Sequence, residues 1–486
     1  MKKIISFIFI TIISITLVAC GNTGDGGGGG SQQIELSYAD WGDQELNQQL
    51  IDAFMQEYPD IRVTLRSDIS GSGDAFTGNL VTAAQAGLLP DVFATDNVPT
   101  VVNAGLTLDV AELWNNDPET ELIFKDIAAT AVYNGKRFAV PSFQFLKGIM
   151  INLDIFEEAN LTTVEGQYRI DNDGYPEKDW TFEEFVNICS AIKDFDPNNY
   201  SGGYVLGLDT WYGTPDFQQV WPMMDDADVA YDTWDGNQFN YSTSQSWQDA
   251  MAAKVEMHAL TDGTTTRLED EFLEANPDLV AYHIAQGTAA MDIEGSWQLG
   301  FINSAAADGI NLGFWPYPQG DAGFFPPTIL DYLAVSSETE YPDEAYLLAK
   351  WMSFGRQGWG ARLDALELGN NLAIANGEDP KLLDRYPIGD YPEIWDRVDG
   401  FVEGVEGIDY IFDHIEFAKP DLDKWLPGYK DFWSWAFDPE NPWNFNDLVV
   451  AGVASVPTWA QEWENKMNEI VQNALSTLGQ PQQEEE

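Results

Sequence analysis

The chain has 486 residues, of which 80 are acidic and 23 basic, so that its formal net charge is −57. So acidic a surface repels phosphate backbones and anionic lipid headgroups, which argues against nucleic acid as a partner. Hydrophobic residues make up 44% of the sequence, enough for a large core divided between two lobes. The acidic residues are spread along the chain, and we interpret them as a solvated surface suited to a saline or alkaline exterior.

The N-terminus has the pattern of a secretory signal peptide. Two lysines precede a mostly apolar run over residues 4–17, which is too short for a membrane-spanning helix. Residues 17–21, Leu-Val-Ala-Cys-Gly, resemble the bacterial lipobox, whose cysteine is lipidated and becomes the first mature residue. We therefore expect residues 1–19 to be removed and Cys20 to anchor the protein on the outer side of the cell membrane through its acyl chains. The alternative is an uncleaved membrane anchor.

The segments that flank the globular body are polar and rich in glycine or acid. Residues 20–33 include five consecutive glycines and are expected to form a flexible tether, and residues 481–486 a disordered acidic tail. Lipidation of Cys20 leaves Cys189 as the other cysteine, so no disulfide is expected. Cys189 shares an apolar helical stripe with phenylalanine and isoleucine residues, which indicates a buried small hydrophobe and not a nucleophile.

The first part of the body alternates strands with helices. Strands near residues 34–38, 61–65 and 89–94 are separated by two amphipathic helices, which predicts a parallel sheet with right-handed crossovers. Ligands of such sheets bind beyond the carboxyl ends of the strands. The side chains that follow the first and third strands are Trp41, Asp43, Asp96 and Asn97.

A second candidate region runs over residues 282–297. It reads as a helix that ends at Gly287, an apolar strand at residues 289–293, and a Gly-Ser turn that presents Trp297. An indole exposed at the end of a strand suits the apolar face of a sugar, although a buried core tryptophan is the alternative. Asp209, Trp211 and Tyr212 follow another apolar strand in the same way.

Several of these segments resemble the extracellular solute-binding proteins of ABC importers, the family related to maltose-binding protein. The similarity rests on Trp-Gly-Asp at 41–43, Ala-Gly-Leu-Leu-Pro-Asp-Val-Phe at 86–93, Asn-Gly-Lys-Arg-Phe-Ala-Val-Pro at 134–141, and Ala-Ala-Met with Gly-Ser-Trp at 289–297. The chain departs from the family at residues 151–154, where Ile-Asn-Leu-Asp replaces the usual Tyr-Asn-Lys-Asp. The resemblance weakens over the Trp-rich residues 388–463, which form either a ligand lid or a helical layer with an aromatic core.

The resemblance implies an α/β fold of the type II periplasmic-binding-protein kind, in which two discontinuous lobes are joined by a hinge. The first lobe would hold residues 34–141 and 289–332, and the second lobe residues 142–288 and 333–480. The chain would cross between the lobes near residues 140–143, 287–293 and 331–335.

The resemblance also implies a function. The chain would be the lipid-anchored substrate-binding component of an ABC importer, a monomer without catalytic activity or cofactor, which delivers a sugar or oligosaccharide to the membrane permease. We expect a neutral sugar, because the sequence is rich in large aromatic residues and poor in basic ones. A cationic solute such as a polyamine, or a metal chelate, is the rival ligand, since aromatic and acidic groups also suit cations. The expected ligand contacts are Trp41, Asp43, Asp96, Asn97, Gln144, Asp209, Trp211, Tyr212, Trp297, Asp331 and Tyr332.

Other chemistry finds little support in the sequence. The three histidines have no metal-ligand spacing, and no nucleophile or phosphate-loop motif occurs. Residues 171–175, Asp-Asn-Asp-Gly-Tyr, suggest calcium, but the EF-hand alignment would place Arg169 and Trp180 at ligand positions, so a turn is the better interpretation. The alternative from another class is a lipid-anchored glycoside hydrolase, because 80 acidic residues make chance carboxylate pairs certain.

Overall fold

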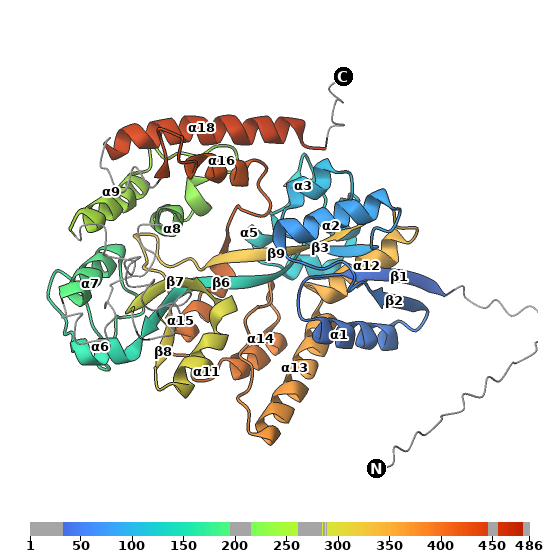
Figure 1. The fold of residues 1–486 in the computed structure, drawn as a ribbon, viewed down its shortest axis with the longest axis horizontal. Helices are drawn as coiled ribbons and strands as arrows, with labels where there is room; N and C mark the ends of the chain where they lie inside the picture. Colours follow the sequence, from blue (N-terminus) through green and yellow to red (C-terminus); the bar gives the residue numbers. More distant parts are fainter. Residues whose placement is uncertain are drawn as a thin grey trace, which may run out of the picture.

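The chain folds into two lobes that lie side by side (Figure 1). The computed structural model describes residues 33–194, 215–260, 284, 287, 289–445 and 455–479. Over these residues, no helix combines the length and the apolar character that crossing a bilayer requires.

The first lobe contains the βαβαβ unit that the sequence predicts. Strand β1 (Ile34–Ala39) lies between β2 (Ile61–Leu65) and β3 (Val92–Thr95) and is parallel to both, while α1 (Gln44–Glu57) and α2 (Gly73–Gln85) connect them. Helix α1 buries its apolar stripe, which includes Leu50 and Phe54, and ends just before a proline. The other elements of this lobe are α3 (Val98–Asn103), α4 (Ala111–Asn116), η1 (Pro118–Leu122), α5 (Lys125–Ala128), β4 (Val132–Tyr133), β5 (Lys136–Arg137) and α12 (Pro342–Met352).

Two long strands cross from one lobe to the other (Figure 1). The first half of β6 (Val140–Asn152) pairs with β9 (Pro327–Val335), which continues the sheet of the first lobe through β3. The second half of β6 pairs with β7 (Met291–Gly295) and β8 (Leu312–Trp315), which belong to the second lobe. A third connection is made by β10 (Lys419–Pro420), which pairs with the start of β9. One continuous strand therefore joins the two cores.

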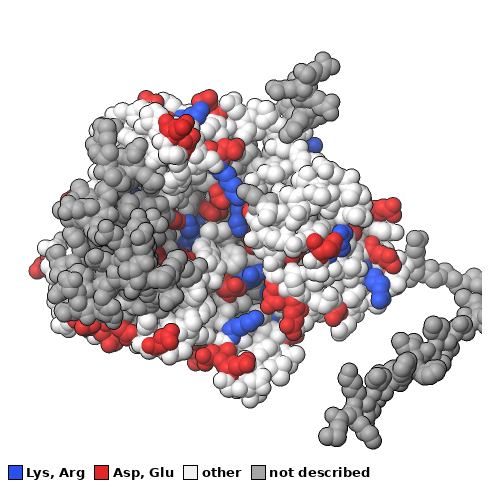
Figure 2. All heavy atoms as spheres, viewed as in Figure 1, with Lys and Arg blue, Asp and Glu red and all other residues white. Residues whose placement is uncertain are grey.

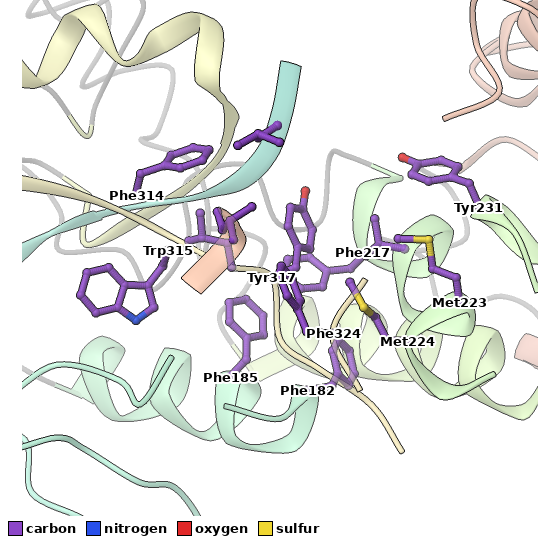
Figure 3. Close-up of a cluster of buried hydrophobic side chains, with 14 of the residues drawn as sticks. Phe182, Phe185, Phe217, Met223, Met224, Tyr231, Phe314, Trp315, Tyr317 and Phe324 are labelled. Atoms are coloured by element: carbon purple, nitrogen blue, oxygen red, sulfur yellow. The ribbon is translucent and has the colours of Figure 1, made fainter. Parts of the chain in front are cut away.

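The second lobe is a layer of helices around the β6–β7–β8 sheet, with a core that is unusually rich in aromatic rings. Figure 3 shows Phe185 of α7, Phe217 of α8 and Tyr317 meeting in this core. Thr181 and Glu184 form a capping box at the start of α7, with both reciprocal hydrogen bonds. The helices are α6 (Leu153–Ala159), α7 (Phe182–Asp194), α8 (Asp216–Asp225), η3 (Tyr231–Thr233), α9 (Gln245–Leu260), η6 (Ser296–Gln298), α11 (Gly300–Ala307), α15 (Ile408–Phe412), η8 (Ile415–Phe417), α16 (Tyr429–Ala436) and α18 (Val456–Thr477).

Between the lobes, at the lower edge of Figure 1, lie α13 (Arg356–Asn376), α14 (Pro392–Val398) and η7 (Asp399–Phe401). Helix α13 packs against α1 and α12 of the first lobe, while its Trp359 and Leu363 join the apolar core of the second.

The packing divides the chain differently from the expected lobe boundaries. Residues 290–325 contribute to the core of the second lobe and not of the first, because β7 and β8 pair with the far half of β6. Conversely, α12 packs in the core of the first lobe, next to β3 and β9. Only the part of β9 near residues 330–335 belongs to the first core, and the structure shows no crossing at residues 289–293.

The described part of the Trp-rich region is a helical layer with an aromatic core, the second of the two interpretations. Trp459 and Trp463 of α18 are buried, and Trp463 packs against Trp433 of α16 with ring centroids 5.7 Å apart. Cys189 is also buried, and burial raises the pKa of its thiol, as expected for a structural cysteine.

Candidate ligand site between the lobes

The candidate site is the hollow between the two lobes. Figure 2 shows this hollow in the middle of the view, with both basic and acidic side chains on its walls. Strands β6 and β9 cross between the lobes in the same part of the molecule (Figure 1). Lys430 of α16, in the second lobe, lies 3.8 Å from Asp96, which follows β3 in the first lobe.

Trp41 and Asp96 lie at the carboxyl ends of β1 and β3, as the order of strands predicts. Trp41 is half-buried, and its ring meets Phe76 edge-on at 5.2 Å between centroids. The Asp96 carboxylate accepts a hydrogen bond from the Thr77 hydroxyl at 3.3 Å and lies 3.8 Å from the ammonium of Lys430. Asp96 is therefore oriented by contacts from both lobes.

Asp43 and Asn97 lie at the same edge of the sheet, where each caps the N-terminus of a helix. Asp43 accepts from the backbone N–H groups of Glu45 and Leu46 at the start of α1, at 3.0 and 3.2 Å. Asn97 accepts from the N–H of Thr100 in α3 at 3.1 Å. Partial burial opposes ionisation of Asp43, but the backbone N–H groups and Lys381 together lower its pKa.

Asp331 and Tyr332 are neighbours on β9, so their side chains point to opposite faces of the sheet. The Asp331 carboxylate forms an ion pair with the Lys424 ammonium and is 6% exposed. Tyr332 is fully buried in the core of the first lobe, and burial raises the pKa of its hydroxyl. The buried ring of Tyr332 is therefore ruled out as a ligand contact, while Asp331 stays a predicted contact.

Gln144 is fully buried on β6 and holds a neighbouring segment in place. Its amide nitrogen donates to the Pro387 carbonyl at 2.7 Å, and its backbone exchanges hydrogen bonds with Tyr386. These contacts position residues 386–387 against the crossing strand and leave Gln144 no exposed surface.

Trp297 is presented by η6, directly after β7, as the Gly-Ser turn predicts. It is 38% exposed, whereas every other tryptophan in the described part of the chain is buried or half-buried. Its ring packs edge-on against Phe145 at 5.9 Å, and Phe145 in turn lies 5.3 Å beneath the Arg385 guanidinium. Burial raises the pKa of the adjacent Glu294. An accessible indole, a second ring and charged groups therefore occur together.

Four of the expected functional residues lie outside the described residues. These are the lipidation candidate Cys20 and the ligand candidates Asp209, Trp211 and Tyr212.

A family model for bacterial extracellular solute-binding proteins matches residues 40–354, which is more than half of the chain. The chain belongs to this family. No curated protein sequence matches it significantly.

The fold agrees with the type II, two-lobe architecture of solved binding proteins. The cyclic α-maltosyl-1,6-maltose binding protein from Arthrobacter globiformis is 19% identical, with a TM-score of 0.61 over 90% of this chain and 99% of that chain. The sugar-binding protein MalE from Xanthomonas citri is 16% identical, with a TM-score of 0.61 over 92% and 100%. The maltose/maltodextrin-binding domain from Bdellovibrio bacteriovorus, bound to maltotriose, is 15% identical, with a TM-score of 0.54 over 90% and 100%. At these identities the likeness establishes the fold.

Sequence reasoning missed the lysines of this solute-binding protein that pair with carboxylates near the strands joining its lobes. Lys147 on β6 pairs with Asp216 at the start of α8, and its ammonium also donates to the Tyr231 hydroxyl at 3.1 Å. Burial on its own would lower the pKa of Lys147, but Asp216 next to it raises the pKa above the ordinary value. A signal was available, since a lysine interrupts an otherwise apolar strand at residues 145–151.

Asp421 lies close to the lysines of the crossing segments. Burial raises its pKa to about 7, and Asp423 adds to this effect, while Lys147 and Lys424 oppose it. Nothing in the local sequence marks Asp421, because its burial depends on the pairing of β10 with β9.

The described residues offer little for metal chemistry. They contain no group of three or more His, Cys, Asp or Glu side chains placed to hold a metal ion. His414 faces the Tyr410 carbonyl, with 2.8 Å between Nδ1 and the oxygen. Asp171 accepts from the N–H groups of Asp173 and Tyr175, both at 2.9 Å, which is the turn that the sequence favours over a calcium loop.

Proposed function

We propose that this solute-binding protein is the substrate-binding component of an ABC importer and captures a neutral sugar or oligosaccharide between its lobes. The observation that carries the proposal is Trp297, an exposed indole beside Phe145 on the strand that joins the lobes. Aromatic faces stack on the apolar faces of sugar rings, so an accessible indole at this position suits a carbohydrate.

The charged groups of the site support a neutral ligand. Lys147, Lys424 and Lys430 each lie close to a carboxylate, in the pairs Lys147–Asp216, Lys424–Asp331 and Lys430–Asp96. Such pairs supply donors and acceptors side by side, which matches hydroxyl groups that both donate and accept. The proposed ligand contacts are Trp41, Asp96, Asp331 and Trp297, with Asp209, Trp211 and Tyr212 from the segment outside the described residues. Asp43 and Asn97 would contribute only the hydrogen-bonding groups that helix capping leaves free.

The known ligands of similar structures point the same way. Binding proteins of this fold have been solved with cycloalternan in Listeria monocytogenes and with maltotriose in Bdellovibrio bacteriovorus. We carry over the class of ligand, a sugar, and the membrane permease as the receiving partner.

The proposal includes a lipid anchor at Cys20. It is supported by the two lysines, the apolar run and the lipobox-like residues 17–21 of the sequence. Two acyl chains would hold a monomeric protein at the outer side of the membrane, and the glycine-rich residues that follow would let it reach the permease. Mass spectrometry of the protein from its own membrane should find the lipid on Cys20 and no residues before it. An unmodified Cys20 would remove the anchor from the proposal.

A thermal-shift screen across neutral sugars, polyamines and amino acids tests the ligand class. We expect a sugar to raise Tm, to change the tryptophan fluorescence, and to make the protein more compact in small-angle X-ray scattering as the lobes close. A response to polyamines alone would replace the sugar with a cation.

The alternative, a glycoside hydrolase, is separated from a binding protein by product analysis. The protein is incubated with the best sugar of the screen, and the mixture is followed by chromatography. We expect binding without turnover, so that the sugar is recovered unchanged. Sustained release of shorter products would establish the hydrolase.

A further inference from the structure

A small cavity lies between the start of α1 in the first lobe and α13, apart from the lysines of the proposed sugar site. Its volume is about 130 Å³, and its lining comes from α1, α13 and the segment that follows α13. Although the chain has only 23 basic residues, three of them, Arg362, Lys381 and Arg385, line this one cavity.

Among these three side chains, Arg362 has no ion-pair partner in the described part of the chain. Its side chain is 4% exposed, and among the described residues no carboxylate lies within ion-pair distance of it. Its guanidinium donates to the Met352 carbonyl at a long 3.4 Å and lies over the rings of Phe143 and Trp359. Burial, followed by the neighbouring Arg385, lowers the pKa of Arg362 to about 10, although Tyr38, Asp40 and Asp384 oppose this shift. A buried cation with so few partners is costly unless something else compensates it.

Arg137 shows how the same chain treats another buried arginine. It is also 4% exposed and also has no carboxylate partner in the described structure. Its guanidinium, however, donates to the carbonyls of Ala128, Thr130 and Ala139, and it stacks on Trp114 at 3.8 Å. Arg137 is thus held by the protein itself, whereas Arg362 faces a cavity.

Each of the three carboxylates at or near the cavity has hydrogen-bond or ion-pair partners of its own. Asp43 caps α1 and lies 3.6 Å from Lys381, and Asp384 lies 3.2 Å from Arg385. Asp40 accepts from the Tyr38 hydroxyl at 2.7 Å and from the Gly42 N–H at 2.5 Å. The three carboxylates therefore balance the three cations in number, and Asp40 and Asp384 raise the pKa of Arg362 from a distance. The Arg362 guanidinium nevertheless has no described hydrogen-bond partner besides the Met352 carbonyl.

An uncharged donor also lines the cavity. Asn47 lines the cavity and is 4% exposed, and its amide nitrogen has no partner among the described residues. A methyl group added at Gly42 would lie 3.0 Å from a carboxylate oxygen of Asp40, 3.6 Å from a terminal nitrogen of Arg385 and 3.8 Å from the Asn47 amide nitrogen. An unpaired buried donor in a cavity that two arginines also line calls for an acceptor.

We propose that this cavity binds a small inorganic anion, which accepts hydrogen bonds from Arg362, Arg385 and Asn47. The planar N–H fork of arginine suits both a halide and an oxyanion, and the volume has room for either. Both guanidinium groups lie over Phe143 on β6, at 5.8 and 4.5 Å. The anion therefore holds α1, α13 and the crossing strand together.

Thermal unfolding at constant sodium concentration tests the site. Sodium gluconate, whose anion is too large for the cavity, is replaced stepwise by sodium chloride or sodium sulfate, so that screening by sodium stays the same. We expect a saturable rise in Tm of about 2 °C or more for the anion that binds. In Arg362→Gln the rise should disappear, while in the control Arg137→Gln it should remain. An equal rise in wild type and Arg362→Gln would overturn the proposal.

If Arg362→Gln does not fold, crystallography of the wild-type protein tests the site independently. Crystals of the wild-type protein are grown or soaked with bromide, and anomalous data are collected at the bromine edge. We expect a peak within hydrogen-bond distance of Arg362 and Asn47, and its loss in Asn47→Leu. If sulfate is the only anion that raises Tm, the crystals are soaked in sulfate instead, and we expect electron density for sulfate at the same place. A cavity that holds only water in both crystals would refute the site.

Discussion

Lys430 on α16 of the second lobe places its ammonium 3.8 Å from the carboxylate of Asp96, which follows β3 in the first lobe. The same ammonium donates to the Asp96 backbone carbonyl at 3.3 Å. The backbone makes a parallel link, since the N–H of Val98 donates to the Lys424 carbonyl at 2.9 Å. One side chain thus ties the lobes together at the edge where ligands of such sheets bind.

Replacing Lys430 with methionine should favour an open arrangement of the lobes. The pair is partly exposed, so we expect it to contribute at most about 1 kcal/mol, equivalent to a weakening of ligand binding by up to about fivefold. Small-angle scattering of the ligand-free variant should give a larger radius of gyration than the wild type. Lys466→Met is the matched control, because Lys466 pairs with Glu469 within α18 and contacts no residue of the first lobe in any ion pair of the described structure. Identical scattering from wild type and Lys430→Met would show that the pair does not hold the lobes.

Replacing Trp297 with alanine should weaken sugar binding by at least about 1 kcal/mol, because one stacking face is lost. The ring is 38% exposed, so the melting temperature should change little. Isothermal titration with the best sugar of the screen measures the effect. Leu368→Ala, at an exposed position of α13, should leave the affinity unchanged. Unchanged affinity in Trp297→Ala would remove this indole from the site.

Sequence reasoning was most successful where a local pattern decides the structure. The βαβαβ order of the first lobe follows from the periodicity of adjacent residues. The exposure of Trp297, in contrast, was expected from the family resemblance, because the local pattern alone also suits a buried tryptophan. The lobe boundaries depend on which half of β6 each later strand pairs with. The residues of a strand do not by themselves reveal which strand will be its neighbour.

Individual site residues were harder to predict because one pattern serves two purposes. A polar side chain between a strand and a helix faces the ligand edge of the sheet, but it is also the natural cap of that helix, as Asp43 and Asn97 show. Tyr332 was expected beside Asp331, yet alternation along β9 sends it into the core. The lysines that meet at the hollow come from β6, α16 and the residues before α16, and only the tertiary fold brings them together.

The crossing strand should tolerate no side chain at Gly148. A methyl group there would lie 2.6 Å from a ring carbon of Phe314 and 2.8 Å from the Trp315 carbonyl oxygen. We expect Gly148→Ala to lower the free energy of unfolding by about 1–3 kcal/mol, the usual cost of overpacking. Gly300→Ala, in α11 with open space around it, should be neutral or slightly stabilising. Chemical denaturation of the two variants provides the comparison, and equal stability would contradict the close contact between β6 and β8.

Asp232 should make the stability of the second lobe depend on pH. Its carboxylate is fully buried and accepts from the hydroxyls of Tyr241 and Tyr429, both at 2.8 Å. Burial raises its pKa to about 8, whereas hydrogen bonds from Tyr241, Tyr429 and Trp247 oppose that rise. The folded chain therefore holds a proton that the unfolded chain releases near its ordinary pKa of 3.8. It follows that the stability contributed by this group is lost as the pH rises from about 4 to about 8 and changes no further above that.

The variant Asp232→Asn isolates this effect. Asparagine resembles the protonated acid in shape and tolerates the left-handed backbone of this position, where φ is 55°. The free energy of unfolding of the variant, minus that of the wild type, should rise by up to about 1.4 kcal/mol per pH unit between pH 5 and 8. The other acidic groups cancel in this difference. Asp68→Asn is the control, because Arg66 lowers the pKa of Asp68, so its effect belongs below pH 4. Urea unfolding at each pH measures the difference, and a flat difference between pH 5 and 8 would mean that Asp232 is ionised throughout that range.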